Sequence, residues 1–171
     1  MSASDLRTMR AFAATAGIEL PDVEAEDAAR RWEPFRQEAF VDEAGKISTF
    51  DMRVDPVEDD ERTRVLATHP DGKPMMQEFD GKLVIRFTNG SNGKSVLRNV
   101  TSYAMVYTTA DGVRYTYYRG RAGVGVRIGN PTTPSGWYIM DGTFFVRATP
   151  AKQRDFLVQD GSMEDLCETL A

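Results

Sequence analysis

Apolar residues recur at two distinct periods along this chain, a helical period near the start and a strand-like alternation after residue 63. In the helical part the apolar positions are Leu6, Met9, Phe12 and Ala16. Ser4 can accept a hydrogen bond as a helix N-cap, and Gly17 can adopt the left-handed conformation that ends a helix. The pattern therefore predicts a helix over residues 4–16.

A second, weaker helix is predicted to begin at Pro21 and to stop near Glu33. Its middle consists mostly of alanine and charged residues, and Pro34 disfavours a helical residue before it. Neither helix has an apolar face wide enough to be stable in isolation. Each therefore needs a surface to pack against, either in the same chain or in a partner.

From residue 63 onward, short apolar and β-branched runs alternate with turns that contain Gly, Asn, Asp or Pro, Asp141-Gly142 among them. These residue types favour turns because they tolerate a positive φ or, in the case of Pro, preset φ. The candidate strands are Thr63–Thr68, Lys82–Thr88, Ser95–Thr101, Ala104–Thr109, Val113–Arg119, Val124–Ile128, Trp137–Met140, Thr143–Thr149 and Arg154–Val158. Such spacing predicts a mainly β fold, an antiparallel meander that forms a barrel or a sandwich.

Two short segments complete the predicted β domain. The glycine-rich run Gly120–Gly125 lies between two candidate strands, and we interpret it as a bend or a close backbone approach in a sheet. At the C-terminus, Ser162 caps a short helix with Asp165 at the capping-box position, and Leu166 and Leu170 can face the body of the domain.

Charge divides the chain at nearly the same place as the change of period. Residues 1–62 carry 16 acidic and 8 basic side chains, whereas residues 63–171 carry 10 acidic and 13 basic ones. The run 51–62 is predicted to be a solvated acidic linker, with calcium binding by its carboxylates as the alternative. We therefore predict an acidic, partly helical N-terminal arm and linker (1–62) and an antiparallel β domain with the C-terminal helix (63–171). The opposite net charges favour docking of arm on body, within one chain or between neighbours.

Few residues offer catalytic or cofactor chemistry. The single histidine, His69, lies in Thr68–Gly72, which has the composition of an exposed turn. The single cysteine, Cys167, lies on an apolar helix face, where a buried structural thiol is expected. Ser91–Ser95 resembles the end of a phosphate-binding loop, but a strand follows it instead of a helix, so a hairpin turn is predicted. No catalytic residue, no cofactor and no metal site are predicted.

Aromatic and basic residues gather in the same part of the β domain. The side chains that could stack on a glycan are Tyr115, Tyr117, Trp137 and Tyr138. The arginines in this region are Arg98, Arg114, Arg119, Arg121 and Arg127. Such a surface is typical of an ordinary β wall with half-buried tyrosines, and it also fits a protein interface, a carbohydrate site or a nucleic-acid site. The net charge of −5 counts against nucleic acid.

The stretch Phe87–Val100, with the sequence FTNGSNGKSVLRNV, resembles a pattern of small all-β domains from high-GC Gram-positive bacteria and their phages. The similarity extends to Pro134–Tyr138, a Pro/Gly turn followed by a strand, and to the ending Asp165-Leu166-Cys167. The bacterial domains are typically exported, whereas this chain begins without a signal peptide and adds an acidic arm. The resemblance implies a phage particle protein that is made in the host cytoplasm and assembled into the virion.

These observations together predict a non-enzymatic structural or adhesion component of a phage virion, associated with the tail. The arm would dock on other copies of the chain or on other virion proteins through Phe12, Trp32 and Phe35. One alternative is a glycan-binding β module that uses the four aromatic side chains, and a further alternative is a small β-barrel that encloses an apolar ligand. No nucleic acid is expected as a partner, and no apolar stretch is long enough to span a membrane.

Overall fold

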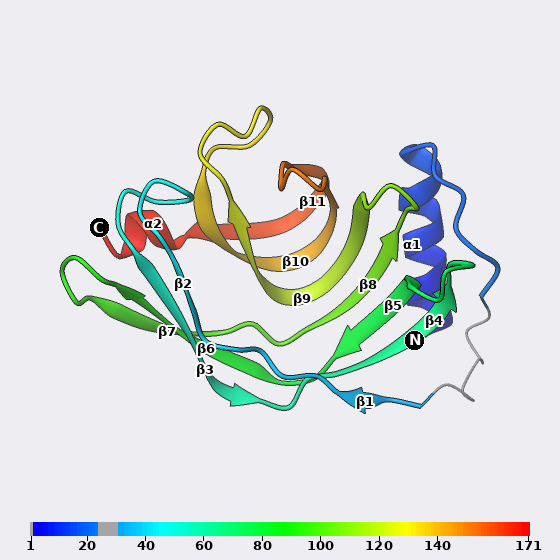
Figure 1. Cartoon of the computed structure of the whole chain (residues 1–171), viewed down its shortest axis with the longest axis horizontal. Helices are drawn as coiled ribbons and strands as arrows, with labels where there is room; N and C mark the ends of the chain where they lie inside the picture. The colour runs from blue at the N-terminus through cyan, green and yellow to red at the C-terminus, as the bar shows by residue number, and fades with distance from the viewer. Residues whose placement is uncertain (1, 24–30) are drawn as a thin grey trace.

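The computed structural model of the chain describes residues 2–23 and 31–171. Strands account for 52% of the chain and helices for 10%, which confirms the predicted mainly β, antiparallel fold in a sandwich-like arrangement (Figure 1). The elements are α1 (Ala3–Thr15), β1 (Glu33–Pro34), β2 (Phe40–Asp42), β3 (Met52–Asp59), β4 (Arg62–Thr68), β5 (Pro74–Asp80), β6 (Leu83–Asn89), β7 (Ser95–Asn99), β8 (Ser102–Thr108), β9 (Arg114–Val126), β10 (Gly136–Ala148), β11 (Arg154–Asp165) and α2 (Leu166–Thr169).

The strands form two sheets. Sheet A has seven strands in the order β1-β4-β5-β8-β9-β10-β11, and sheet B has four in the order β2-β3-β6-β7. The chain crosses between the sheets after β1 and again in the short connections β3–β4, β5–β6 and β7–β8. The last three crossings are the shortest. These crossings lie side by side, since the Asp60 amide donates to the Lys82 carbonyl (2.8 Å) and the Val100 amide donates to the Leu83 carbonyl (2.9 Å). The two sheets are therefore joined along one line.

The long strands β9, β10 and β11 curve strongly (Figure 1). Near the midpoint of β10, Gly142 pairs with Gly120 of β9 on one side and with Gly161 of β11 on the other. The turn predicted at Asp141-Gly142 is wrong, because β10 continues through it. The bend predicted for the Gly120–Gly125 run is confirmed at Gly120, which has a positive φ of 104° inside β9.

A glycine can bend a strand as well as end it. For this reason, each of two pairs of predicted strands is one continuous strand in the structure. Val113–Arg119 and Val124–Ile128 correspond to the two halves of β9, and Trp137–Met140 and Thr143–Thr149 correspond to the two halves of β10. The apolar side chains Tyr118, Ala122, Val124, Met140, Phe144, Val146, Phe156 and Met163 pack together around this bend. The curvature thus lets the outer part of sheet A bury a small core of its own.

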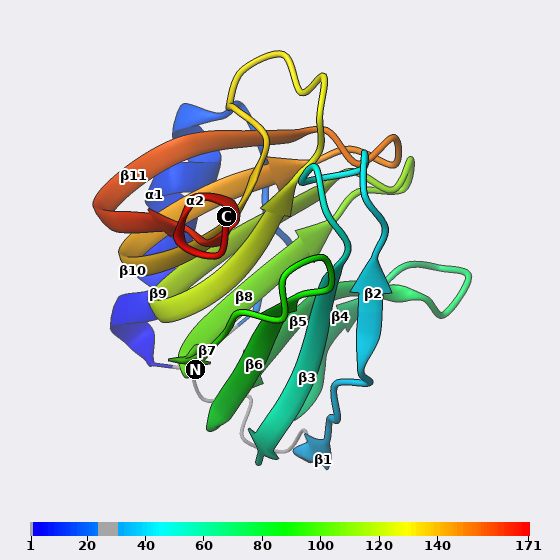
Figure 2. The ribbon, with the colours of Figure 1, turned by 90° about the vertical axis from the view of Figure 1, so that its left-hand side faces the viewer.

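Helix α1 confirms the helix predicted over residues 4–16, but its N-cap is Ser2, whose hydroxyl accepts a hydrogen bond from the Asp5 amide (3.1 Å). Leu6 and Met9 are buried in one apolar cluster with side chains of sheet A, namely Leu66, Met76, Tyr103, Met105, Tyr117 and Phe145. Figure 1 shows α1 at one end of the molecule and sheet B at the other, and in Figure 2 the helix lies behind β9, β10 and β11. The helix therefore covers the face of sheet A that carries Tyr103, Met105, Tyr117 and Phe145.

The predicted acidic linker, residues 51–62, is not a linker. It contains β3, which pairs with both β2 and β6, and it reaches the first residue of β4. Its carboxylates are engaged by neighbours in the same chain: Asp55 pairs with Arg53, and Glu58 pairs with Lys82. The structure thus places strands on both sides of the predicted boundary between residues 62 and 63. The many acidic residues led to the prediction of a linker, although Met52 and Val54 of this segment are buried in β3.

The remaining helix predictions have mixed outcomes. The helix predicted from Pro21 to Glu33 falls largely on residues 24–30, which lie outside the described residues, and Glu33 belongs to β1. The C-terminal helix is present, but Asp165 caps it and Ser162 lies within β11. Leu166 and Leu170 are buried in the core between the two sheets, as predicted.

Candidate functional site

The most deeply buried polar group of the described residues is the carboxylate of Glu78 on β5, whose side chain has no exposed surface. Arg64 of the neighbouring strand β4 forms an ion pair with it through Nε. On the other side, the Tyr103 hydroxyl of β8 donates to Glu78 Oε2 at 2.6 Å. Burial and the adjacent Glu78 carboxylate raise the pKa of the Tyr103 phenol far above its ordinary value, so the hydroxyl stays protonated and donates.

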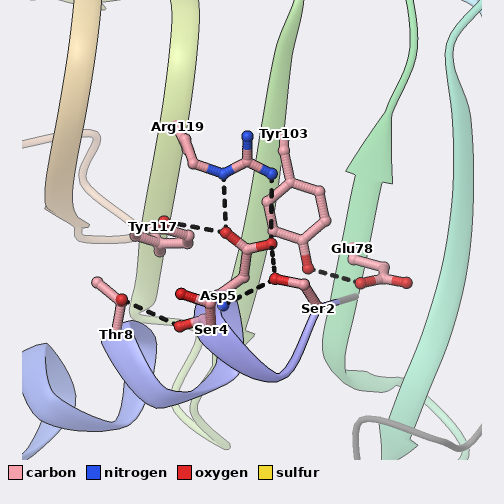
Figure 3. Close-up of polar contacts among 8 residues, drawn as sticks. All are labelled: Ser2, Ser4, Asp5, Thr8, Glu78, Tyr103, Tyr117 and Arg119. Carbon is pink, nitrogen blue, oxygen red and sulfur yellow. Dashed lines mark hydrogen bonds and ion pairs between the residues drawn. The ribbon is translucent and has the colours of Figure 1, made fainter.

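A second buried carboxylate, Asp5, joins helix α1 to sheet A. Figure 3 shows it between Ser2 at the start of the helix and two side chains of β9. Ser2 Oγ donates to Asp5 Oδ2 (2.6 Å), Tyr117 Oη donates to Oδ1 (3.2 Å), and Arg119 Nε donates to Oδ1 (2.8 Å). Asp5 thus holds the N-cap residue Ser2 in place, and its ion pair with Arg119 joins the acidic arm to the basic body within one chain.

Burial by itself raises the pKa of Asp5, but the hydrogen bonds from Arg119 and Ser2 outweigh it, so the pKa lies below its ordinary value. The charged form therefore stabilises the fold at pH values above the ordinary carboxyl pKa, and this contribution disappears as the pH falls through the lowered value. We expect Asp5→Asn to reduce the free energy of unfolding by about 1–3 kcal/mol at neutral pH.

The difference between Asp5→Asn and the wild type should begin to shrink below about pH 4, the ordinary carboxyl pKa, and the contribution of the charge should be lost as the pH falls through the lowered pKa of the folded protein. Urea denaturation at a series of pH values measures this. Asp141→Asn is the matched control, because Asp141 pairs with Arg121 at an exposed position, where an ion pair contributes about 0–1 kcal/mol. A difference for Asp5→Asn that stays constant down to pH 2 would contradict the assigned role of the charge.

Both buried carboxylates are fully engaged by donors of the same chain, and their role is to hold α1 and the strands together. The accessible chemistry lies on the face of β8 and of the first half of β9 that is opposite to α1. There an apolar groove of about 320 Å³ runs between the two sheets. Its walls include Phe35, Phe40, Phe79, Val106, Tyr118 and Trp137. Period-two alternation explains the separation: along β9, Tyr115 and Tyr117 face α1, while Thr116 and Tyr118 face the groove.

The apolar groove is continuous with a second hollow, the hairpin cavity, of about 650 Å³. It lies between the turn that joins β4 to β5 and the turn that joins β8 to β9. Phe79, Val106 and Arg114 line both spaces, so together they form one continuous concave surface. His69 lines the hairpin cavity from the first of these turns and donates through Nε2 to the Thr108 carbonyl oxygen (2.9 Å), which confirms its predicted position in a turn.

One acidic and one basic side chain line the apolar groove, Glu61 and Arg114. Burial and the neighbouring Asp59 raise the pKa of Glu61, although a hydrogen bond from Gln37 Nε2 (3.1 Å) opposes this shift. Arg114 is exposed and, among the described residues, makes no hydrogen bond or ion pair through its side chain. A cation without a carboxylate partner therefore stands at the edge of a largely apolar wall.

Arg114 also lines a third hollow, the basic pocket, of about 320 Å³. Its walls are Gly112, Arg114, Ala148, Thr149, Pro150, Lys152 and Arg154. Three of these residues are basic and none is acidic. Arg114 and Arg154 both lie opposite Ala148, on the strands that flank β10, so their side chains emerge on the same face of the sheet.

The four aromatic side chains predicted to stack on a glycan do not share one surface. Tyr115 and Tyr117 pack on the α1 side of sheet A, where Tyr117 is 2% exposed. Trp137 lies between the two sheets and donates through Nε1 to Asp42 (2.8 Å). Tyr138 is on the other face of β10 from Trp137, and its hydroxyl donates to the Pro134 carbonyl (3.0 Å). Only Trp137 of the four lines the apolar groove.

The three predicted arm anchors contact the sheet of their own chain. Phe12 packs against Phe145, with ring centroids 5.7 Å apart, and against Tyr117. Phe35 packs edge-on against Phe79 (5.2 Å) and lines the apolar groove. Trp32 has two guanidinium groups over its ring, those of Arg62 (4.6 Å) and Arg64 (4.7 Å). The arm therefore contributes to the core, to the groove and to the surroundings of the buried Glu78–Arg64 pair.

Two other predictions about chemistry can be compared with the structure. Cys167 is half-buried beside the core, and burial raises the pKa of its thiol to about 11, which keeps it protonated at neutral pH. Residues 91–94 belong to the connection between β6 and β7, and Ser95 begins β7; the Asn89 amide donates to the Lys94 carbonyl (2.9 Å) across this connection. The predicted hairpin turn is confirmed.

Sequence reasoning named Arg114 and Arg127 among the arginines of the β domain, but it missed Arg154 and Lys152. Arg154 appears only as the first residue of a predicted strand, and Lys152 precedes it in a turn. The register of β9, β10 and β11 is what brings Arg114 next to Arg154, and no local pattern reveals that register. Comparison of the chain with known protein families, with characterised proteins and with solved structures finds no match. Function is therefore argued from the geometry of the site.

Two searches of the described residues add constraints. In this part of the chain no three or more His, Cys, Asp or Glu side chains gather into a group that could hold a metal ion. Neither of the two helices found there is long and apolar enough to cross a bilayer. The continuous concave surface is accordingly the feature on which a functional proposal can be built.

Proposed function

We propose that the protein is a binding module that holds a small, largely apolar ligand on the concave surface between its two sheets. The observation that carries the proposal is the continuity of the apolar groove with the hairpin cavity through Phe79, Val106 and Arg114. Ligand sites in proteins are typically concave, lined mainly by apolar and aromatic side chains, and about 300–1,000 Å³ in volume. Both spaces lie in this range.

The strands that form the groove are held rigidly, which supports a preformed site. The Glu78–Arg64 pair and the Tyr103 hydroxyl link β4, β5 and β8 beneath its floor. At the far wall, the hydrogen bond from Trp137 to Asp42 ties β10 to β2. A rigid apolar surface loses little conformational entropy on binding, so more of the burial energy is available as affinity.

Blocking the groove should abolish binding without unfolding the protein. Val106 lies at the junction of the two spaces and is half-buried, so Val106→Trp should fill this junction. We expect the wild type to bind the neutral dye Nile red saturably. Val106→Trp should raise the dissociation constant of the dye by about tenfold or more, since overpacking a site costs about 1–3 kcal/mol. Fluorescence titration measures both.

Val84→Trp is the matched control for this experiment. Val84 is also half-buried in a β-strand, but its neighbours Leu83 and Ile85 face the groove, so its own side chain points to the outer face of sheet B. Binding by Val84→Trp should equal that of the wild type. Absence of saturable dye binding by the wild type, or equal loss in both variants, would refute the proposal.

The virion role implied by the sequence resemblance stays a prediction. The geometry favours the groove, rather than the arm, as the binding surface. Docking through the arm requires anchors that are available to a neighbour. Phe12, Trp32 and Phe35 already contact the sheet of the same chain. Of the three functions considered from the sequence, binding of an apolar ligand is the one that a specific feature of the structure supports.

A further inference from the structure

The basic pocket adjoins the apolar groove, because Arg114 lines both. Arg114 and Arg154 flank the small residue Ala148 at the same register, two strand spacings or roughly 10 Å apart in backbone position. Arginine side chains are long enough for both guanidinium groups to lie over Ala148. Lys152 adds a third cation from the turn that joins β10 to β11.

A fourth cation, Arg127, is brought to the same place by the loop that follows β9. In this loop the Asn130 side chain donates to the Arg154 carbonyl (2.9 Å) and accepts from the Arg154 amide (2.8 Å). The Asn130 amide in turn donates to the Arg127 carbonyl (3.1 Å). These hydrogen bonds fold the loop back onto the start of β11 and set Arg127 near Arg154.

The positive charge of these four side chains has no carboxylate partner among the described residues. Within residues 2–23 and 31–171, the side chains of Arg114, Arg127, Lys152 and Arg154 make no ion pair and no hydrogen bond. The nearest carboxylate in sequence to Arg154 is Asp155, which is engaged instead by Arg147 NH1 (3.0 Å) and by the Thr132 hydroxyl (2.5 Å).

Arg154 is half-buried, which makes its unpaired charge costly in the absence of an anion. Burial lowers the pKa of the Arg154 guanidinium, and the positive charges of Arg114 and Arg127 lower it further, against an opposing effect of Tyr118. Like charges that are gathered without a counter-charge destabilise one another, and a bound anion would relieve this repulsion. Arginine is also suited to carboxylate and phosphate groups because its planar fork can donate two parallel hydrogen bonds.

We propose that Arg114, Lys152 and Arg154, with Arg127 beside them, bind the anionic headgroup of an amphiphile whose apolar part lies in the apolar groove. This inference rests on the proposed function and adds the chemical class of the ligand. The basic pocket is complementary to an anionic group, and Arg114 lines both this pocket and the apolar groove. An amphiphile can occupy both spaces at once, whereas a purely apolar molecule would leave the cations unpaired. The headgroup is a phosphate, sulfonate or carboxylate.

Three compounds separate the possibilities when their binding to the full chain is measured by isothermal titration calorimetry, below any micelle-forming concentration. They are dodecyl phosphate, dodecanol and inorganic phosphate. We expect dodecyl phosphate to bind about tenfold or more tightly than either of the others, because charge-assisted hydrogen bonds add to the apolar contacts. Dodecanol should still bind, and raising the salt concentration should weaken the binding of dodecyl phosphate but not that of dodecanol.

Arg154→Gln should weaken the binding of dodecyl phosphate by about tenfold and leave that of dodecanol unchanged. Arg86→Gln is the matched control, since Arg86 is an exposed arginine of β6 that lines neither hollow and forms no ion pair with another described residue. Thermal unfolding identifies a variant that has lost its fold. Arg114→Gln, at an exposed position, provides a second test if Arg154→Gln is unstable.

The outcomes distinguish this inference from the proposed function. Equal affinities for dodecyl phosphate and dodecanol would overturn the headgroup site while leaving the apolar groove in place. Binding of inorganic phosphate as tight as that of dodecyl phosphate, with none of dodecanol, would mean a free-anion site and would overturn the amphiphile. Failure of all three compounds to bind would overturn both proposals. Selective loss of dodecyl phosphate in Arg154→Gln supports the inference.

Discussion

Replacing Glu78 with alanine is expected to reduce the free energy of unfolding by about 3–5 kcal/mol, a large part of the stability of an ordinary domain. The carboxylate is fully buried and Arg64 is only 9% exposed, so the substitution leaves a buried guanidinium without its counter-charge. It also removes the acceptor of the Tyr103 hydroxyl. Chemical denaturation in urea measures the loss.

The matched control for Glu78→Ala is Glu58→Ala. Glu58 forms an ion pair with Lys82, but both side chains are about half exposed, and an exposed pair contributes about 0–1 kcal/mol. Glu78→Gln should fall between the two, because the amide oxygen can still accept from Tyr103 while the charge is lost. If Glu78→Ala cost no more than Glu58→Ala, the pair would not be a main support of the strands beneath the groove.

The second large effect is expected at the bend of sheet A. Gly161 has a φ of +151°, and a Cβ built on it would overlap the Asp141 carbonyl oxygen and lie 2.9 Å from Gly142 Cα. Both obstacles are backbone atoms, which cannot rotate away. We expect Gly161→Ala to cost about 3–5 kcal/mol, as the sum of an unfavourable backbone conformation and overpacking.

Gly93→Ala isolates the contribution of the backbone conformation. Gly93 also has a positive φ, +75°, but a Cβ there meets nothing within 4 Å, so a cost of only about 1–2 kcal/mol is expected. Comparison of the two thermal midpoints tests whether close approach at Gly142 and Gly161 supports the bend. Equal losses would show that the tight contact between β10 and β11 is dispensable.

The bend matters for function because it shapes the basic pocket. It curves β9 so that Arg114 at its start and Arg127 just after its end both come near Arg154 of β11. A Gly161→Ala variant that remained folded should therefore also bind dodecyl phosphate more weakly than the wild type. This links the stability of the sheet to the proposed headgroup site.

The sequence by itself determined the local elements for which neighbouring residues decide the conformation. Helix α1 follows from apolar side chains at helical spacing, and its end follows from Gly17. Most strands after residue 63 follow from β-branched and aromatic runs between turn residues. The antiparallel, mainly β class follows in turn, because short strands joined by tight turns pair with their neighbours.

Elements whose polar residues are satisfied by distant partners escaped prediction. Strand β5 begins with Pro74 and contains Glu78, so its sequence does not have the pattern of a buried strand. In the structure, Arg64 and Tyr103 from two other strands bond the Glu78 carboxylate and allow its burial. Strand β3 was interpreted as a linker because of its acids, although Asp55 is paired with Arg53. Local propensity is a weak guide where tertiary contacts supply the compensating charge.

The tertiary structure alone decided the candidate site. Asp141-Gly142 has the composition of a turn, and only its pairing with β9 and β11 makes it a bend within one strand. That bend and the strand register bring together Arg114, Arg127 and Arg154, which are far apart in sequence and carry no shared motif. Convergence of side chains depends on long-range pairing, whereas helix and turn formation depends on adjacent residues, and this is why the sequence predicted the elements but not the site.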